Sequence, residues 1–436
     1  MPNRTIKVDY LARVEGEGGL AIKVRDGVVT DAKLKIFEPP RFFEAFLRER
    51  SFTEAPDITA RICGICPVAY QMSAVHAVEN AAGVQVTGPI RTLRRLLYCG
   101  EWIESHALHV FMLHAPDFLG FDDAVQMARE HGDVVRTGLA IKKAGNAIVT
   151  LIGGREIHPI NVRVGGFYKA PRKKDLTALA ETLKPARDSV VKALDWARAL
   201  PFPGFEVNYE YVALHHENEY PFNEGRIISS KGLDIDAVEY PDHFVEYQEP
   251  HSTALHSRID GRGAYLVGPM ARFNLNREKL TPMAAEAAIR ASLTAPCNNP
   301  FQSILVRLVE ILFSFEEALR LIDAYEEPDK PAVDINMGAS VGMAATEAPR
   351  GLLFHRYEMD ESGAIVSAKI VPPTSQNQKS IEDDLKGVAQ RHLELTDDAL
   401  KWRCEQTIRN YDPCISCAAH FLRLDIDRGD SGGAHP

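Results

Sequence analysis

Two cysteine pairs, one near each end of the chain, constrain its fold more than any other feature. The first is Cys63 and Cys66, and the second is Cys414 and Cys417. A C-x-x-C spacing lets two thiolates converge on one metal ion because the two intervening residues form a tight turn. Thiolates bind zinc, iron, copper(I) or nickel in preference to hard cations. If the two pairs meet at one metal site, they join the two ends of the chain. The spacing alone does not identify the metal, and a structural zinc site is one alternative.

Composition limits the classes of protein to consider. The 436 residues, 45% hydrophobic and 25% charged, suffice for a large buried core. The net charge of −10 argues against a nucleic-acid partner, because no basic excess is available. Without a secretory signal or an apolar run long enough to span a bilayer, we expect a cytoplasmic protein with no transmembrane segment. Export carried by a partner subunit is the alternative.

The seven cysteines favour metal or catalytic use over disulfides. Their number is odd, and the chain carries no secretion signal, so reduced thiols are expected. Cys99, Cys297 and Cys404 have no partner at ligand spacing, and we expect them to be core residues. This leaves the two pairs as the candidate ligands.

Hydrophobic periodicity predicts an α-rich mixed α+β fold, with a central bundle of long helices and small peripheral β-sheets. The most regular pattern is an apolar face from Phe301 to Leu319, fit for the centre of a bundle. We find no internal repeat, linker or boundary, and expect one domain over residues 1–420 with an extension at 421–436. The predicted strands are 5–8, 20–24 and 28–36 plus a hairpin within 353–371, and the other predicted helices are 68–82, 89–114, 175–200, 380–395 and 396–410.

Four further motifs, in order along the chain, accompany the cysteine pairs. They are Arg13-Val14-Glu15-Gly16, Arg41-Phe42-Phe43-Glu44, Ala348-Pro349-Arg350-Gly351 and Pro373-Thr374-Ser375-Gln376-Asn377. Together with the cysteine pairs they resemble the large, catalytic subunit of nickel–iron hydrogenases, in which the last two motifs resemble loops over the metal site. The resemblance is greatest to the cytoplasmic, cofactor-coupled (nicotinamide- or deazaflavin-linked, sulfhydrogenase-like) members. It implies the hydrogenase large-subunit fold and the reaction H2 ⇌ 2H⁺ + 2e⁻.

The resemblance also implies what the cysteines bind. Cys63 and Cys414 would be terminal nickel ligands, while Cys66 and Cys417 would bridge nickel and iron. The iron of this family carries carbon monoxide and cyanide ligands. Soft sulfur ligands donate electron density and let nickel change its oxidation state.

By the same resemblance, further residues surround the metals. Glu15 would be the first proton relay, because heterolytic H2 cleavage releases a proton that a nearby carboxylate can accept. Arg350 would lie over the metals, oriented by Asp412 through a charge-assisted hydrogen bond. Pro349 and Thr374 would line the iron pocket. A surface glutamate and a surface ion pair are the ordinary alternatives for Glu15 and Arg350.

A magnesium ion near the C-terminus is implied as well. Its ligands would be Glu44, His420 and the Ile370 carbonyl, since such a hard ion takes few protein ligands and keeps waters. A plain salt bridge of Glu44 is the alternative. His106 and His109 resemble histidines beside the active site, and we expect them to be buried and hydrogen-bonded rather than metal ligands.

The sequence departs from the family pattern at two positions. Tyr70 stands four residues after Cys66, where many members have a histidine, which leaves oxygen tolerance open. Ser105 stands where some members have an acidic residue. Family precursors are often cut after the residue matching His420, so residues 421–436 resemble a removable extension, although some members are never cut.

The electrons need partners outside this chain. Beyond the four candidate ligands, the cysteines lack cluster spacing, so iron–sulfur clusters are expected only on a partner small subunit, and flavin on diaphorase-type subunits beyond it. Two other functions remain open: an H2-sensing regulatory hydrogenase, and a complex I-like large subunit. Retention of all four cysteines argues against the second.

Overall fold

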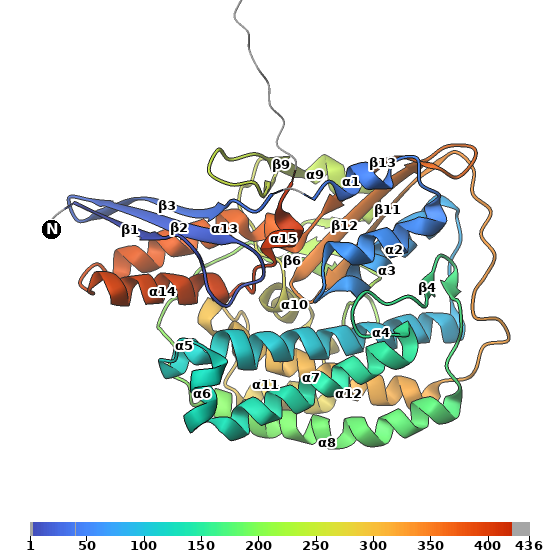
Figure 1. The fold of residues 1–436 in the computed structure, drawn as a ribbon, viewed down its shortest axis with the longest axis horizontal. Coiled ribbons are helices and arrows are strands. Elements are labelled where there is room, and N and C mark those ends of the chain that lie inside the picture. The colour runs from blue at the N-terminus through green and yellow to red at the C-terminus, as the bar shows by residue number, and fades with distance from the viewer. Residues whose placement is uncertain (1–2, 40, 421–436) are drawn as a thin grey trace, which may run out of the picture.

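A bundle of four long helices forms one half of the molecule. The computed structural model describes residues 3–39 and 41–420. Helices α4 (Gly88–Ala107), α7 (Gly132–Gly153), α8 (Lys173–Ala197) and α12 (Ser303–Ala324) pack along one another in the lower part of Figure 1. Helix α12 is buried on nearly all sides, which explains why its apolar residues outnumber those of a surface helix. The predicted central bundle is confirmed.

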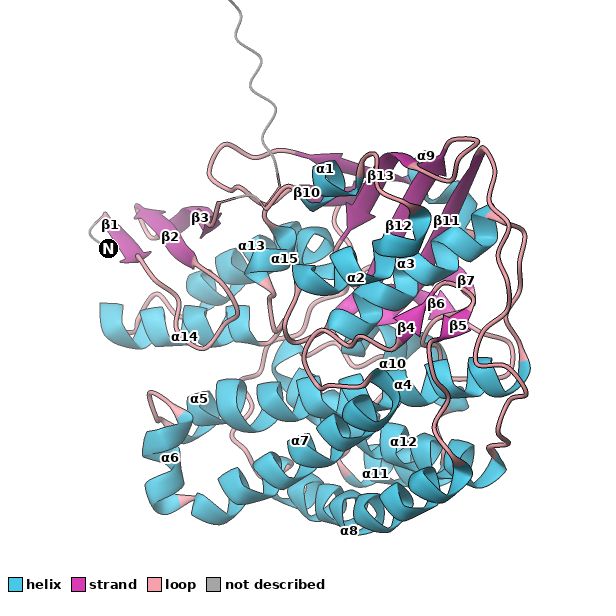
Figure 2. Cartoon of the chain, turned by 45° about the vertical axis from the view of Figure 1, so that its right-hand side comes forward, coloured by secondary structure: helices cyan, strands magenta, loops and turns pink. Residues whose placement is uncertain are grey.

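An antiparallel sheet lies on one side of the bundle, and the solvent-facing helix α8 lies on the opposite side (Figure 1). Its strands β11 (Ser340–Ala348), β12 (Gly351–Met359) and β13 (Ile365–Val371) pair in sequence order. Helix α3 (Pro67–Ala81) packs against β11 and β12. Figure 2 shows the helices of the bundle in the lower part of the molecule and the strands in the upper part, where further helices such as α3 lie among them.

The two ends of the described chain lie side by side. Strands β1 (Arg4–Val8), β2 (Gly18–Arg25) and β3 (Val28–Ile36) form an antiparallel sheet, against which α13 (Pro373–Arg391) packs. Between β2 and β3, Asp26 and Gly27 both have positive φ, 49° and 78°, as a tight two-residue hairpin turn requires. Blue and red segments therefore meet at the upper left of Figure 1.

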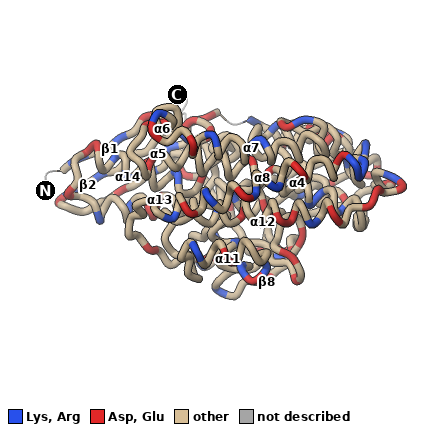
Figure 3. The backbone as a smooth tube through the Cα atoms, turned by 90° about the horizontal axis from the view of Figure 1, so that it is seen from below, with Lys and Arg blue, Asp and Glu red and all other residues tan. Residues whose placement is uncertain are grey.

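Shorter elements complete the fold. In the described residues, no helix is both long and apolar enough to cross a bilayer. Seen from below, basic and acidic residues are interspersed along the bundle helices (Figure 3). The further helices are α1 (Phe43–Leu47), α2 (Ala55–Thr59), α5 (Ala115–Leu119), α6 (Ala124–Glu130), α9 (Tyr240–His243), α10 (Pro269–Asn276), α11 (Pro282–Arg290), α14 (Asp397–Arg409) and α15 (Ile415–Ala418). The further strands are β4 (Val162–Arg163), β5 (Gly166–Phe167), β6 (Val212–His215), β7 (Arg226–Ser229), β8 (Asp234–Ile235), β9 (Phe244–Tyr247) and β10 (His256–Ile259).

Two local expectations differ from the structure. Residues 373–377 form the first turns of α13 rather than a loop, because proline is well suited to the first helical position. Strand β11 was not predicted, since three of its nine residues are alanine and only Val341 and Thr346 are β-branched, the type of residue that favours strands. The expected extension at 421–436 lies outside the described residues.

Candidate metal centre

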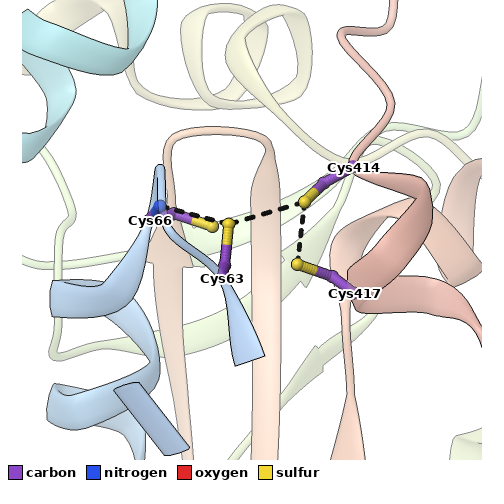
Figure 4. Close-up of side chains that lie close together, drawn as sticks. All are labelled: Cys63, Cys66, Cys414 and Cys417. Atoms are coloured by element: carbon purple, nitrogen blue, oxygen red, sulfur yellow. Dashed lines mark hydrogen bonds between the residues drawn. The ribbon is translucent and has the colours of Figure 1, made fainter. Parts of the chain in front are cut away.

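The four cysteines of the two pairs meet in the folded chain. Their sulfur atoms all lie within 4.8 Å of one another, and none is in a disulfide. Sγ of Cys414 is 3.5 Å from Sγ of Cys63 and 2.8 Å from Sγ of Cys417. Figure 4 shows the four thiols pointing toward one another from two separate segments. This convergence is what a shared metal centre requires.

The early pair is held by a turn and a helix start. The backbone N–H groups of Ile65 and Cys66 each donate to Sγ of Cys63 at 3.3 Å, which closes the C-x-x-C turn. Cys66 immediately precedes α3, whose first N–H groups are bound by the carboxylate of Glu101 on α4. Glu101 thus fixes the start of α3 and, through it, the position of Cys66. The sequence analysis missed this residue, whose only signal is an acidic residue inside a buried helix.

The late pair is joined to the N-terminal segment. Cys414 and Glu15 form an isolated parallel bridge, in which the N–H of Ile415 donates to the Glu15 carbonyl at 2.9 Å. The thiol of Cys414 donates to Oε2 of Glu15 at 3.0 Å, and the N–H of Ser416 donates to the same oxygen at 3.1 Å. The carboxylate of Glu15 is therefore within hydrogen-bond reach of a candidate metal ligand.

Glycine is required beside this bridge. Gly16 has a φ of 88°, and a β-carbon there would lie 2.8 Å from Cβ of Ile415. The buried carboxylate of Asp117 also holds this segment. It accepts hydrogen bonds from Nη2 of Arg13 and from Nε and Nη2 of Arg409 on α14. These contacts fix the N-terminal segment against the C-terminal helices.

Arg350 and Asp412 are both buried beside the thiols. Arg350 lies in the tight turn between β11 and β12, and donates through Nε to the Asp412 carbonyl and through Nη2 to its Oδ1. Burial alone would lower the pKa of Arg350, but Asp412 and the nearby cysteines raise it well above its ordinary value. Arg350 is therefore a fixed cation next to the thiols.

Arg272 holds the turn that carries Arg350, and sequence analysis did not single it out. It is fully buried on α10 and donates to the carbonyl oxygens of Ala348 and Pro349, both at 2.9 Å. It also binds the carboxylates of Glu310 and Glu347. No local pattern distinguishes it, because its partners come from distant parts of the chain.

Thr374 contacts Cys414, and Pro349 directly precedes Arg350. The hydroxyl oxygen of Thr374 accepts a hydrogen bond from the N–H of Cys414 at 3.0 Å. The hydroxyl of Thr374 thereby keeps its own proton for donation to another acceptor. The carbonyl of Pro349 is bound by Arg272.

The polar atoms around the thiols fit a metal centre that carries polar ligands of its own. Nη1 of Arg350 and the hydroxyl of Tyr70 are buried donors without a hydrogen-bond partner in the described part of the chain. Buried donors are rarely left unpaired. The pKa of Tyr70 is raised well above its ordinary value by burial and by the four cysteines, so it stays a proton donor.

Glu44, Ile370 and His420 also meet. Oε1 of Glu44 accepts from the N–H of Ile370 at 2.8 Å, and its Oε2 lies 3.1 Å from Nε2 of His420. A cavity of about 470 Å³ borders these residues and Cys417. The three residues therefore lie together. The contact between Glu44 and His420 is also compatible with the plain salt bridge that the sequence analysis gave as the alternative to a metal ion.

The two histidines of the bundle are buried and hydrogen-bonded, as expected. Nε2 of His106 lies 2.9 Å from Oε2 of Glu310, and Nε2 of His109 lies 2.7 Å from the carbonyl of Arg409. His109 belongs to a π-helical segment, Leu108–His114, that continues α4. Both rings are therefore held by hydrogen bonds to distant parts of the chain.

The fold and the four converging thiols define a metalloprotein with a soft transition-metal centre. The sequence matches the nickel-dependent hydrogenase family over residues 41–137 and 264–420. It is 35% identical to sulfhydrogenase 2 subunit alpha of Pyrococcus furiosus, over 96% of this chain and 100% of that protein. The chain belongs to the nickel-dependent hydrogenase family, and it is the catalytic subunit of an oxidoreductase.

Two further relatives agree. The chain is 29% identical to the HoxS subunit beta of the NAD-reducing hydrogenase of Cupriavidus necator, over 96% of this chain and 95% of that protein. Among solved structures, it is similar to an NAD+-reducing NiFe-hydrogenase in the H2-reduced state, with a TM-score of 0.88 and 28% identity. That similarity covers 96% of this chain and 99% of the other, which confirms the expected large-subunit fold.

Proposed function

We propose that Cys63, Cys66, Cys414 and Cys417 hold a nickel–iron centre at which H2 is reversibly converted to protons and electrons. Cys63 and Cys414 would be terminal nickel ligands, and the other two would bridge the metals. When bound, the centre would supply the redox and Lewis-acid chemistry of heterolytic H2 cleavage. The convergence of the four thiols, with Glu15 in contact with one of them, carries the proposal.

Glu15 is the proposed first proton acceptor. Its Oε2 already accepts a hydrogen bond from the Cys414 thiol, so a proton on that sulfur has a direct path to the carboxylate. The N–H of Ser416 binds the same oxygen and keeps the carboxylate in place. The backbone bridge between Glu15 and Cys414 limits how far the two groups can move apart.

Arg350 is the proposed cation that faces the reacting gas and any anionic ligand on the iron. Its Nη1 has no hydrogen-bond partner in residues 3–39 and 41–420, so it can donate to a cyanide nitrogen. Asp412 acts as the residue that orients it. Thr374 can donate its free hydroxyl proton in the same pocket, and Pro349 would fill the wall beside it.

Glu44, His420 and the Ile370 carbonyl are the proposed ligands of a magnesium ion. The Glu44 carboxylate already contacts both other residues, through the backbone N–H of Ile370 and through Nε2 of His420. Burial alone would raise the pKa of Glu44, but His420 lowers it below its ordinary value, so the carboxylate is charged and suited to a hard cation. Removal of residues 421–436 would leave His420 as the C-terminus.

The electrons would pass to a partner small subunit with iron–sulfur clusters, and then to flavin-containing diaphorase-type subunits. The similar proteins include an alpha subunit of a sulfhydrogenase and a beta subunit of an NAD-reducing hydrogenase, both named as parts of larger enzymes. A cytoplasmic location is also proposed, because the sequence motifs most resemble those of the cytoplasmic, cofactor-coupled hydrogenases.

The test of the centre is metal analysis with infrared spectroscopy on the complex, expressed with its maturation machinery. We expect one nickel and one iron beyond the partner's clusters, with CO and CN⁻ bands. Zinc in their place, without these bands, would overturn the proposal.

The test of Glu15 is H2 oxidation and D2/H⁺ exchange of the Glu15→Gln complex. Loss of the proton acceptor should lower both rates by about 100-fold or more, with nickel and iron retained. Glu17→Gln, at an exposed residue two positions away, is the matched control. Full activity of Glu15→Gln with full metal content would exclude the relay.

A further inference from the structure

A second cluster of possible metal ligands lies outside the cysteine centre. His251 follows β9, His256 begins β10, and Glu382 lies on α13. One ligand atom from each residue falls within 4.8 Å of the others. None of the three belongs to a motif singled out in the sequence, and their positions are brought together only by packing of β10 against α13.

The geometry of the cluster matches shared coordination. Nε2 of His256 lies 3.5 Å from Oε2 of Glu382, close to the separation of about 3.4 Å between two ligands bound tetrahedrally at about 2.1 Å. Nε2 of His251 lies 2.6 Å from Oε1 of Glu382, which is a hydrogen-bond distance. A proton and a metal ion therefore compete for this contact, as they do at histidine ligands in general.

The buried imidazole of His256 supports an ion rather than packing alone. Its side chain is fully buried, and neither ring nitrogen has a hydrogen-bond partner in the described residues. The Glu382 carboxylate, 3.5 Å from Nε2, is too far for a good hydrogen bond, and an under-satisfied buried ring costs free energy. An ion between Nε2 and the carboxylate would satisfy both groups. The ring nitrogen of His251 that faces away from Glu382 lacks a partner there as well.

The carboxylate of Glu382 is prepared for a cation. Each of its oxygen atoms faces one imidazole: Oε1 lies 2.6 Å from Nε2 of His251, and Oε2 lies 3.5 Å from Nε2 of His256. The N–H of Leu34 on β3 donates to its Oε1 at 3.1 Å and fixes its orientation, as outer-shell hydrogen bonds do at metal sites. His251 is partly exposed, which gives an ion a way in.

We propose that His251, His256 and Glu382 bind one divalent transition-metal ion of the zinc class, separate from the cysteine centre. Two imidazoles and one carboxylate select Zn²⁺ or Fe²⁺ over Mg²⁺ and Ca²⁺. Water would complete the coordination on the side of His251.

The ion would fasten the segment that meets the end of the described chain. Thr253 lies two residues after His251. Its carbonyl accepts a hydrogen bond from the N–H of His420 at 2.8 Å, and its N–H donates to the carbonyl of Ile36. Ala254 and Ala419 form a bridge in the same place. An ion that ties His251 to α13 would therefore hold this segment, and with it the position of residues 419 and 420.

The test compares the transition metals of the purified complex in wild-type, His256→Gln and Glu382→Gln forms. The partner's metals are the same in each and cancel. We expect the wild type to hold one more equivalent of divalent transition metal than either variant, with nickel unchanged. His392→Gln, at a half-exposed histidine beside Glu394, is the matched control and should keep the full content.

A second readout does not depend on buried substitutions. After exchange with Co²⁺, the wild-type complex should show visible d–d absorption that His251→Gln, at the partly exposed ligand, lacks. Equal metal content in all forms, or cobalt bands that persist in His251→Gln, would overturn the proposal and leave a metal-free hydrogen-bonded cluster. Nickel content and the CO and CN⁻ bands report separately on the cysteine centre.

Discussion

Asp412 binds Arg350 twice, through its backbone carbonyl at 2.7 Å and through Oδ1 at 3.1 Å. Asp412 has a φ of 52°, in the left-handed region, and lies two residues before Cys414. This conformation lets one residue present both its carbonyl and its carboxylate to the same guanidinium. The position of the cation is thereby tied to the position of the late cysteine pair.

Asp412→Ala should lower H2 oxidation by about 100-fold, because a displacement of about 1 Å in a positioned group can have this effect. Asp412→Asn should lose less, since asparagine keeps an acceptor and tolerates a positive φ. Nickel content should stay unchanged in both. The measurements are turnover and metal content of the complex. The control is Arg356→Lys, at a half-buried arginine on β12, the strand that follows Arg350. Wild-type turnover in Asp412→Ala would contradict the role of Asp412 in orienting Arg350.

Arg272→Met should destabilise the chain by about 3–5 kcal/mol, because it leaves two buried carboxylates without their cation. These belong to Glu310 and Glu347, both fully buried. Thermal unfolding of the complex measures the effect. Arg320→Met, at an exposed arginine paired with Glu317 on α12, should cost about 0–1 kcal/mol. Equal stability of the two variants would refute a structural role for Arg272.

Gly342→Ala should separate β11 from α3. A β-carbon at Gly342 would overlap the carbonyl oxygen of Ala77 on α3, which is backbone and cannot rotate away. Such overpacking costs about 1–3 kcal/mol. Since α3 starts directly after Cys66, nickel content should fall together with the melting temperature. Gly204→Ala, where a β-carbon meets open space, should change neither.

Stability should depend on pH through Glu104. Burial raises the pKa of this carboxyl from 4.5 to about 7, although Lys142 opposes the shift. The folded chain therefore holds this proton more tightly than the unfolded chain, and the stabilisation is full below about pH 4.5 and is lost as the pH rises through 7.

Glu104→Gln removes this titration. Its stability relative to the wild type should rise by on the order of 3 kcal/mol between pH 4.5 and 8. Melting temperatures of both complexes across this range provide the measurement. Glu130→Gln, at an exposed glutamate of α6, should run parallel to the wild type. A Glu104→Gln curve that also runs parallel would show that the carboxyl does not titrate on folding.

Periodicity sufficed where apolar residues repeat regularly and failed for strand β11, where they do not. The apolar face of α12 repeats over many residues, so the sequence alone predicts a buried helix. Strand β11 has no such signal, because its residues are chosen for close contact with α3, as Gly342 shows. Periodicity in the sequence indicates which face of an element is buried, but it does not indicate which other element packs against that face.

The sequence by itself determined the cysteine pairs, the motif order and hence the family, because a C-x-x-C turn is local chemistry within four residues. Only the tertiary structure decided that the Cys414 thiol lies against Glu15, that Arg272 holds the turn of Arg350, and that His256 faces Glu382. Each of these contacts joins residues at least 76 positions apart. Their energies depend on burial and direction, which exist only once the helices and sheets have packed.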